Sequence, residues 1–240
     1  GQNEKLQAER ELLGFYISGH PLNPYRGFDE AINTYREEDI PRLRESSAFR
    51  LCGVVSNIKK NITKKDNRRW AAFNLATRKA IFSVNLFPDA FEEHGERLEE
   101  GALLIAEGEI RYREDRGETQ VTANVLKPLA ERIPSLIPGA CFILRDDPGL
   151  VADFLDKLEV YLHEHTGSTK ITLAFAVPGS SGDGQLHVAQ AELARSLTCT
   201  IALEPFRALT RHEAVLGVEY EPPPLPKLEQ PRWKQRGNAA

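Results

Sequence analysis

Residues 49–87 read FRLCGVVSNIKKNITKKDNRRWAAFNLATRKAIFSVNLF, and the alternation of apolar and polar residues in this stretch decides the fold. Such alternation is typical of β-strands that bury one face. The pattern predicts three strands, at Phe49–Ile62, Trp70–Ala76 and Lys79–Phe87. The polar run Lys64–Arg69 predicts a hairpin turn between the first two, with Asp66 and Asn67 at its tip. We expect Gly53 to permit the bend or bulge that a small barrel needs.

The next forty residues complete a five-stranded pattern. Pro88 opens a predicted short helix, Asp89–Leu98, whose acidic first turns suit the helix dipole. Two further strands are predicted, at Ala102–Tyr112 and Glu118–Leu126. Five strands with one helix between the third and fourth is the order of an OB-fold, which binds oligonucleotides on its second and third strands and through two of its loops. We therefore assign residues 48–130 to an OB-fold domain.

Beyond the barrel the pattern changes to mixed helices and strands. Residues 131–139 contain two prolines and a glycine and are predicted to be a linker. A small α/β domain is predicted at 140–221, with elements at Ala140–Arg145, Pro148–His165, Lys170–Val177, Gln185–Ala191, Pro205–His212 and Val215–Tyr220, and a turn at Gly179–Gly184. The proline-led segment 222–240 is expected to be a disordered tail. The fold class is thus mixed α+β with several domains.

The most specific motif precedes the barrel, where residues 9–22 read ERELLGFYISGHPL. Its apolar residues recur at helical spacing, Gly19 can end a helix, and Pro21 forbids continuation. This string resembles the segment that joins the polymerase core to the C-terminal accessory domains in the alpha subunit of the bacterial replicative DNA polymerase III. The resemblance implies that residues 1–47 are a helical segment and connector from the end of the polymerase body. It also implies that residues 140–221 form a docking module for the clamp-loader tau subunit.

The same resemblance sets expectations about chemistry. The chain opens on Gly1 and contains no methionine, so we expect a fragment of a longer DNA-directed DNA polymerase, a nucleotidyltransferase of the replication holoenzyme. The catalytic aspartates, their Mg²⁺ and the sliding-clamp motif should lie upstream, which leaves this fragment without catalytic residues, metals or cofactors. The pair Asp146–Asp147 is expected to cap the following helix. His163, His165 and the cysteines lack the spacing of zinc ligands.

Charge distribution points to nucleic acid. The chain has a net charge of −4, but residues 49–70 contain seven Lys/Arg and one Asp, a net of +6. Cations can meet phosphates and aromatic rings can stack on bases. The predicted nucleic-acid site comprises Lys59, Lys60, Lys64, Lys65, Arg68, Arg69, Trp70, Phe73, Phe82, Arg111, Tyr112, Arg113 and Arg116. Two alternative interpretations involve no nucleic acid at these residues. In one, the hairpin is only solvated. In the other, Phe73 and Phe82 face the barrel interior.

Composition narrows the remaining choices. No apolar run approaches the ~18 residues of a membrane span, and three widely spaced cysteines suit a reducing cytoplasm. Residues 141–221 carry a net charge of −6, which favours a protein partner over DNA. The expected partners are single-stranded DNA, tau and, through the upstream motif, the clamp, with no membrane. Two rival interpretations are an anticodon-binding OB domain of an aminoacyl-tRNA synthetase and a structural module that binds no nucleic acid.

Overall fold

The computed structural model describes residues 19–35, 47–113, 118–178, 186–192 and 198–227. The chain divides into two compact units. The barrel unit contains residues 1–24, 33–129 and 224–240, and the sheet unit contains residues 25–32 and 130–223. The helix predicted from the ERELLGFYISGHPL motif lies almost entirely outside the described residues.

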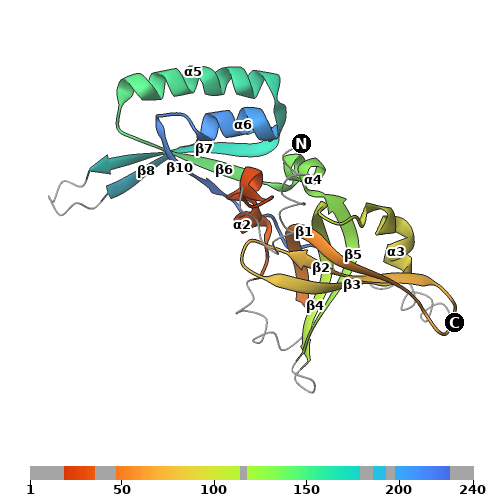
Figure 1. Ribbon diagram of the computed structural model, residues 1–240. Coiled ribbons are helices and arrows are strands. Elements are labelled where there is room, and N and C mark those ends of the chain that lie inside the picture. Colours follow the sequence, from red (N-terminus) through yellow and green to blue (C-terminus); the bar gives the residue numbers. More distant parts are fainter. Residues whose placement is uncertain (1–18, 36–46, 114–117, 179–185, 193–197, 228–240) are drawn as a thin grey trace, which may run out of the picture. The chain divides into compact units, whose positions relative to one another are not determined.

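The barrel unit is a closed five-stranded barrel in the order β1-β2-β3-β5-β4 (Figure 1). Its strands are β1 Ser47–Ile62, β2 Arg69–Ala76, β3 Ile81–Leu86, β4 Leu103–Arg113 and β5 Glu118–Pro128. The β3–β5 pair is parallel and closes the barrel, and the other pairs are antiparallel. A helix α3, Pro88–His94, and a short 3-10 turn η3, Gly95–Arg97, lie between β3 and β4. The predicted barrel and the mixed α+β fold class are confirmed.

Alternation along each strand fills the barrel interior. In β2 the side chains of Ala71, Phe73 and Leu75 are buried, whereas Trp70 and Asn74 face outward. Residues from all five strands join this core, and side chains of α3 such as Phe91 pack against it. Because successive strand residues point to opposite faces, the same alternation that builds the core also fixes what the outside displays.

The first strand, β1, divides into two halves at a bulge. The proximal half, Ser47–Ser56, pairs mainly with β4, and the distal half, Lys59–Ile62, pairs with β2. Between them Asn57 has a positive φ of 55°, and the Glu100 carboxylate accepts from the backbone N–H groups of Asn57 and Ile58, at 3.2 and 2.9 Å. The bulge expected at Gly53 therefore lies four residues later. Gly53 instead permits close packing, because a Cβ there would lie 2.7 Å from the Ala76 carbonyl oxygen.

Polar groups cover the outward side of the proximal half. The Asn33 side-chain oxygen accepts from the Cys52 N–H at 2.7 Å, and Thr34 exchanges two hydrogen bonds with the Arg50 backbone, each 2.9 Å. The Arg50 guanidinium, almost fully buried, pairs with Glu107 at 2.5 Å and donates to the Pro224 carbonyl at 3.0 Å. Pro224, within the predicted disordered tail, is thus bonded to the barrel, and residues 228–240 lie outside the described part.

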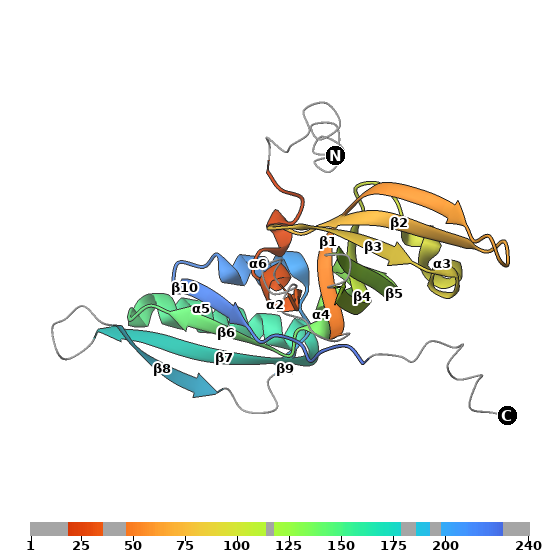
Figure 2. The same cartoon turned by 90° about the horizontal axis from the view of Figure 1, so that it is seen from below.

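The sheet unit contains a five-stranded sheet with helices on one face (Figure 2). Its strands are β6 Gly139–Leu144, β7 Thr166–Pro178, β8 Leu186–Glu192, β9 Thr198–Cys199 and β10 Val215–Tyr220, and its larger helices are α5 Pro148–Glu164 and α6 Leu203–Thr210. The order is β10-β6-β7-β8, with β9 added beside β7. The rings of Phe142, Phe154 and Phe206 meet between the sheet and these helices. Asp147 caps α5 by accepting from the Leu150 N–H at 3.1 Å, as predicted.

Two segments contain helix where the sequence predicted a linker and a connector. The linker predicted at 131–139 is largely helical, because α4 spans Leu129–Leu136 and buries its apolar side chains. The connector before the barrel contains η1, Asn23–Tyr25, and α2, Phe28–Ile32, whose Phe28 ring lies 4.3 Å from that of Tyr220. The turn at Gly179–Gly184 lies outside the described residues.

Candidate nucleic-acid interface

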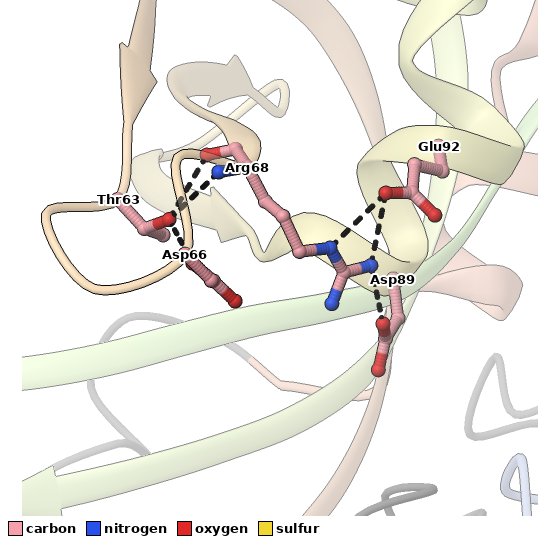
Figure 3. Close-up of polar contacts among 5 residues, drawn as sticks. All are labelled: Thr63, Asp66, Arg68, Asp89 and Glu92. Carbon is pink, nitrogen blue, oxygen red and sulfur yellow. Dashed lines mark hydrogen bonds and ion pairs between the residues drawn. The ribbon is translucent and has the colours of Figure 1, made fainter.

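The distal half of β1 and the start of β2 form a hairpin arm that projects beyond the barrel (Figures 1 and 2). Its turn is held by Thr63, whose N–H donates to the Arg68 carbonyl at 2.9 Å and whose hydroxyl accepts from the Arg68 N–H at 2.9 Å. The same hydroxyl is bonded to Asp66 (Figure 3). This bond lowers the pKa of the Asp66 carboxyl. Asn67 takes the left-handed conformation that the turn requires, with φ 57°.

Most of the predicted cations line this arm and are exposed to solvent. The exposed ones are Lys59, Lys60, Lys64, Lys65 and Arg69. The strand pairing divides them between two faces. Lys59 lies opposite Ala72, whose side chain faces away from the barrel interior, whereas Lys60 lies opposite the buried Ala71. The lysines of the turn stand at the end of the arm, beyond both faces.

An aromatic pair lies on the outward face beside the arm. The Trp70 and Phe87 rings have centroids 6.2 Å apart, and Phe87 is 43% exposed. The same face continues through cross-strand pairs. Between β1 and β2 the pair is Asn61–Trp70, and between β2 and β3 the pairs are Ala72–Asn85 and Asn74–Ser83. We call this face the outer platform: Asn61, Trp70, Ala72, Asn74, Ser83, Asn85 and Phe87. It offers two rings for stacking, and amides and a hydroxyl for hydrogen bonds.

The structure contradicts two of the predicted stacking residues. Phe73 and Phe82 are 1% and 5% exposed and belong to the barrel core, so neither has a face open to a base. Tyr112 also packs against that core. The reason lies in the strand period: Trp70 and Phe73 are three residues apart and must point to opposite faces. The same rule identifies Phe87, which the sequence analysis did not include. Phe87 continues the series of outward-facing residues that starts at Ile81 in β3.

Arg68 has a different environment from the other cations of the arm. Its Nη2 lies 2.6 Å from Oδ1 of Asp89 and 3.0 Å from Oε1 of Glu92, and its Nε donates to the same Glu92 oxygen at 3.1 Å (Figure 3). The hydrogen bonds to Asp89 and Glu92 raise the pKa of the guanidinium. Two carboxylates of α3 therefore neutralise a charge that the sequence analysis assigned to phosphate.

The remaining predicted cations, Arg111, Arg113 and Arg116, lie in and beside the loop between β4 and β5, and the structure describes only part of this region. Arg111 is exposed and lies 3.5 Å from the Glu109 carboxylate. The side chain of Arg113, and Arg116 as a whole, lie outside the described residues. A contribution of this loop to nucleic-acid binding therefore stays a prediction.

Within the described ranges, no three His, Cys, Asp or Glu side chains lie close enough together to hold a metal ion. The longest helix, α5, runs from Pro148 to Glu164, and none of the helices in the described part is long and apolar enough to cross a membrane.

Comparison with known proteins agrees with this geometry. Residues 49–129 match the family described as OB-fold nucleic acid binding domain. The chain is 27% identical over 165 residues to the DNA polymerase III subunit alpha of Escherichia coli K12, covering 68% of this chain and 14% of the relative. It is 35% identical over 106 residues to that of Aquifex aeolicus, covering 44% of this chain and 9% of the relative. The chain thus spans a small part of these relatives, and the resemblance to their family is confirmed.

Among solved structures, part of the chain is similar to a mitochondrial single-stranded DNA binding protein from S. cerevisiae, with 13% identity and a TM-score of 0.30. That match covers 35% of this chain and 97% of the other. A score this low carries no functional argument.

Proposed function

We propose that this chain is a C-terminal part of a replicative DNA polymerase III alpha subunit and that its barrel binds single-stranded template DNA on the outer platform. The observation that carries the proposal is the open ring pair of Trp70 and Phe87 beside the exposed lysines of the arm. Bases would stack on the rings, and phosphates would meet Lys59, Lys64 and Lys65.

The chemistry of the platform favours a single strand over a duplex. Stacking on a side chain needs a base whose face is uncovered, and duplex bases cover one another. Each stacked base contributes about 1–3 kcal/mol and does so with little sequence preference. The polar groups of Asn74, Ser83 and Asn85 accept or donate to base edges without adding charge. Binding therefore combines salt-dependent phosphate contacts with salt-independent stacking.

The wider roles are also proposals. The names of the relatives support a polymerase as the intact protein. We infer that the sheet unit docks to the clamp-loader tau subunit, since its acidic charge between residues 141 and 221 suits a protein surface better than DNA. The clamp motif and the catalytic aspartates would lie upstream of Gly1. Alone, this chain should show no primer extension with Mg²⁺ and nucleotides.

Tryptophan emission provides a direct test of the platform. The chain has two tryptophans, so Trp233→Phe leaves Trp70 as the sole reporter. In that background, titration with oligo(dT) should quench the emission as a base stacks on the indole. Phe87→Ala should weaken binding about 5- to 150-fold, which corresponds to about 1–3 kcal/mol. Leu216→Ala, an exposed apolar residue of the sheet unit, is the matched control and should bind as the parent does.

Two results would overturn the proposal. If oligo(dT) neither quenches Trp70 emission nor binds the chain at the highest concentration reached, a structural module that binds no nucleic acid would remain. A tRNA that competes at lower concentration than oligo(dT) would favour the anticodon-binding alternative.

A further inference from the structure

The contacts of Arg68 join the arm to the first turns of α3. Its guanidinium is bonded to both Asp89 and Glu92, and its backbone N–H and carbonyl are both bonded to Thr63. The residue is therefore fixed at the main chain and at the side chain. The lysines at the end of the arm have no comparable contact among the interactions recorded for the described residues.

This contact lies directly beside the ring pair. In the β2–β3 register Ala71 is opposite Leu86, and the rings of the adjacent residues, Trp70 and Phe87, have centroids 6.2 Å apart. Arg68 is two residues before Trp70, and Asp89 is two residues after Phe87. The Arg68–Asp89 ion pair, with Nη2 2.6 Å from Oδ1, therefore joins two residues that each lie two positions along the chain from a ring.

The ion pair of Arg68 lies at the junction where β3 ends and α3 begins. Phe87 is the N-cap residue of α3, and Pro88 is its first residue, so the Phe87 ring stands where strand geometry ends. Beyond Leu86 no β2–β3 backbone pairing is recorded in the described residues. The ion pair therefore links the residue that precedes β2 to the first turns of α3, beyond the point where the β2–β3 pairing ends.

We propose that Arg68 is a positioning residue, which together with Asp89 and Glu92 holds the Trp70 and Phe87 rings at stacking distance and makes no phosphate contact. This inference rests on the proposed function of the platform. Arg68 would thus act on the stacking rings, whereas its charge alone had suggested a contact with phosphate. The two carboxylates also repel phosphates, so the DNA backbone passes over the lysines of the arm and away from α3.

The salt dependence of single-stranded DNA binding separates the two roles. A cation that meets a phosphate contributes about 0.7 to the slope of log K against log salt for a single strand. Lys64→Gln, the matched control, should therefore lower the magnitude of the slope by about 0.7. Arg68→Gln should leave the slope unchanged and weaken binding about two- to fivefold, the range that an ion pair this exposed can supply.

A second measurement links Arg68 to the rings. If Arg68 positions Phe87, part of the Phe87 contribution is already lost in Arg68→Gln, so the combined variant should lose less affinity than the product of the single losses. A slope that falls in Arg68→Gln as it does in Lys64→Gln, or losses that multiply with Phe87→Ala, would overturn the positioning role alone. Absence of any binding by the parent chain would overturn both this inference and the proposed function.

Discussion

The proximal and distal halves of β1 are continuous in the backbone, yet one is buried on both faces and the other is exposed on both. Residues 49–56 are all buried, because the barrel core covers one face and the segment around Asn33 and Thr34 covers the other. The distal half pairs with β2 and presents its cations to solvent. The exposed half takes its direction from the buried half. The buried half of the strand therefore acts as the scaffold that sets the direction of the arm.

Two arginines summarise the difference. The Arg50 side chain is 5% exposed and paired with Glu107, whereas that of Arg68 is 34% exposed and paired with two carboxylates. Breaking a buried pair leaves an uncompensated charge away from water, while an exposed pair contributes little to stability. The same residue type therefore maintains the fold in one half of the hairpin and orients side chains in the other.

The largest effect is expected from Arg50. Arg50→Ala should lower the free energy of unfolding by about 3–5 kcal/mol, because Glu107 is left buried without its partner. Urea unfolding followed by circular dichroism measures the loss. Lys59→Ala, on the distal half of the same strand, should stay within about 0.5 kcal/mol of the parent. Equal losses in the two variants would remove the distinction between the halves.

Truncation of the tail tests the cover of the proximal half. A chain that ends at Pro222 loses the buried Pro223 and the Pro224 carbonyl that accepts from Arg50. It should be destabilised by about 1–3 kcal/mol, the cost of an unsatisfied buried donor. A chain that ends at Lys227 keeps both residues and should melt with the parent in differential scanning calorimetry. If the shorter chain melts at the same temperature, the Arg50–Pro224 bond contributes nothing.

The bulge between the halves should respond to backbone conformation. Asn57→Ala should cost about 1–2 kcal/mol, because an ordinary side chain disfavours the positive φ that Asn57 adopts. Asn57→Gly should be close to neutral, since glycine accepts this conformation. Thermal unfolding of the two variants provides the comparison. A bulge that tolerates alanine as well as glycine would mean that the backbone relaxes and the junction is not fixed.

The smallest effect concerns the turn of the distal half. The Asp66 carboxyl should titrate below the 3.8 usual for aspartate, because the Thr63 hydroxyl is bonded to its charged form. With the folded pKa below the unfolded one, this bond contributes stability above pH 3.8, and the contribution is lost as pH falls through the folded value. An NMR titration of the Asp66 carboxyl carbon measures the pKa. In Thr63→Val the value should return toward 3.8; an identical titration in both proteins would contradict the assigned cause.

Sequence periodicity predicted the barrel well because alternation is a local signal. The strands over Arg69–Ala76 and Ile81–Leu86 lie within two residues of their predicted bounds, and the helix opened by Pro88 was placed correctly. The α4 helix escaped because Pro134 within it was interpreted as a breaker. A turn of helix that is buried by tertiary packing can override such local signals.

The candidate site was predicted less well, for two separate reasons. The choice of Phe73 over Phe87 was an error about which residues of a strand share a face, and the alternation in the sequence could have corrected it. The pairing of Arg68 could not have been found in this way, because Asp89 and Glu92 are more than twenty residues away and their approach depends on how α3 leaves β3. The burial of Arg50 likewise depends on Glu107 and Pro224, which are remote in sequence.

The strand register of the barrel also sets where this chain can change in length. One residue inserted between Leu51 and Val55 would turn every later side chain of the proximal half to the opposite face and empty the core. One residue added between Lys64 and Lys65 would only enlarge a turn, at a small entropic cost. The arm can therefore change in length while the barrel that carries it stays intact, and under the proposed function such a change would alter the length of single strand that the arm covers.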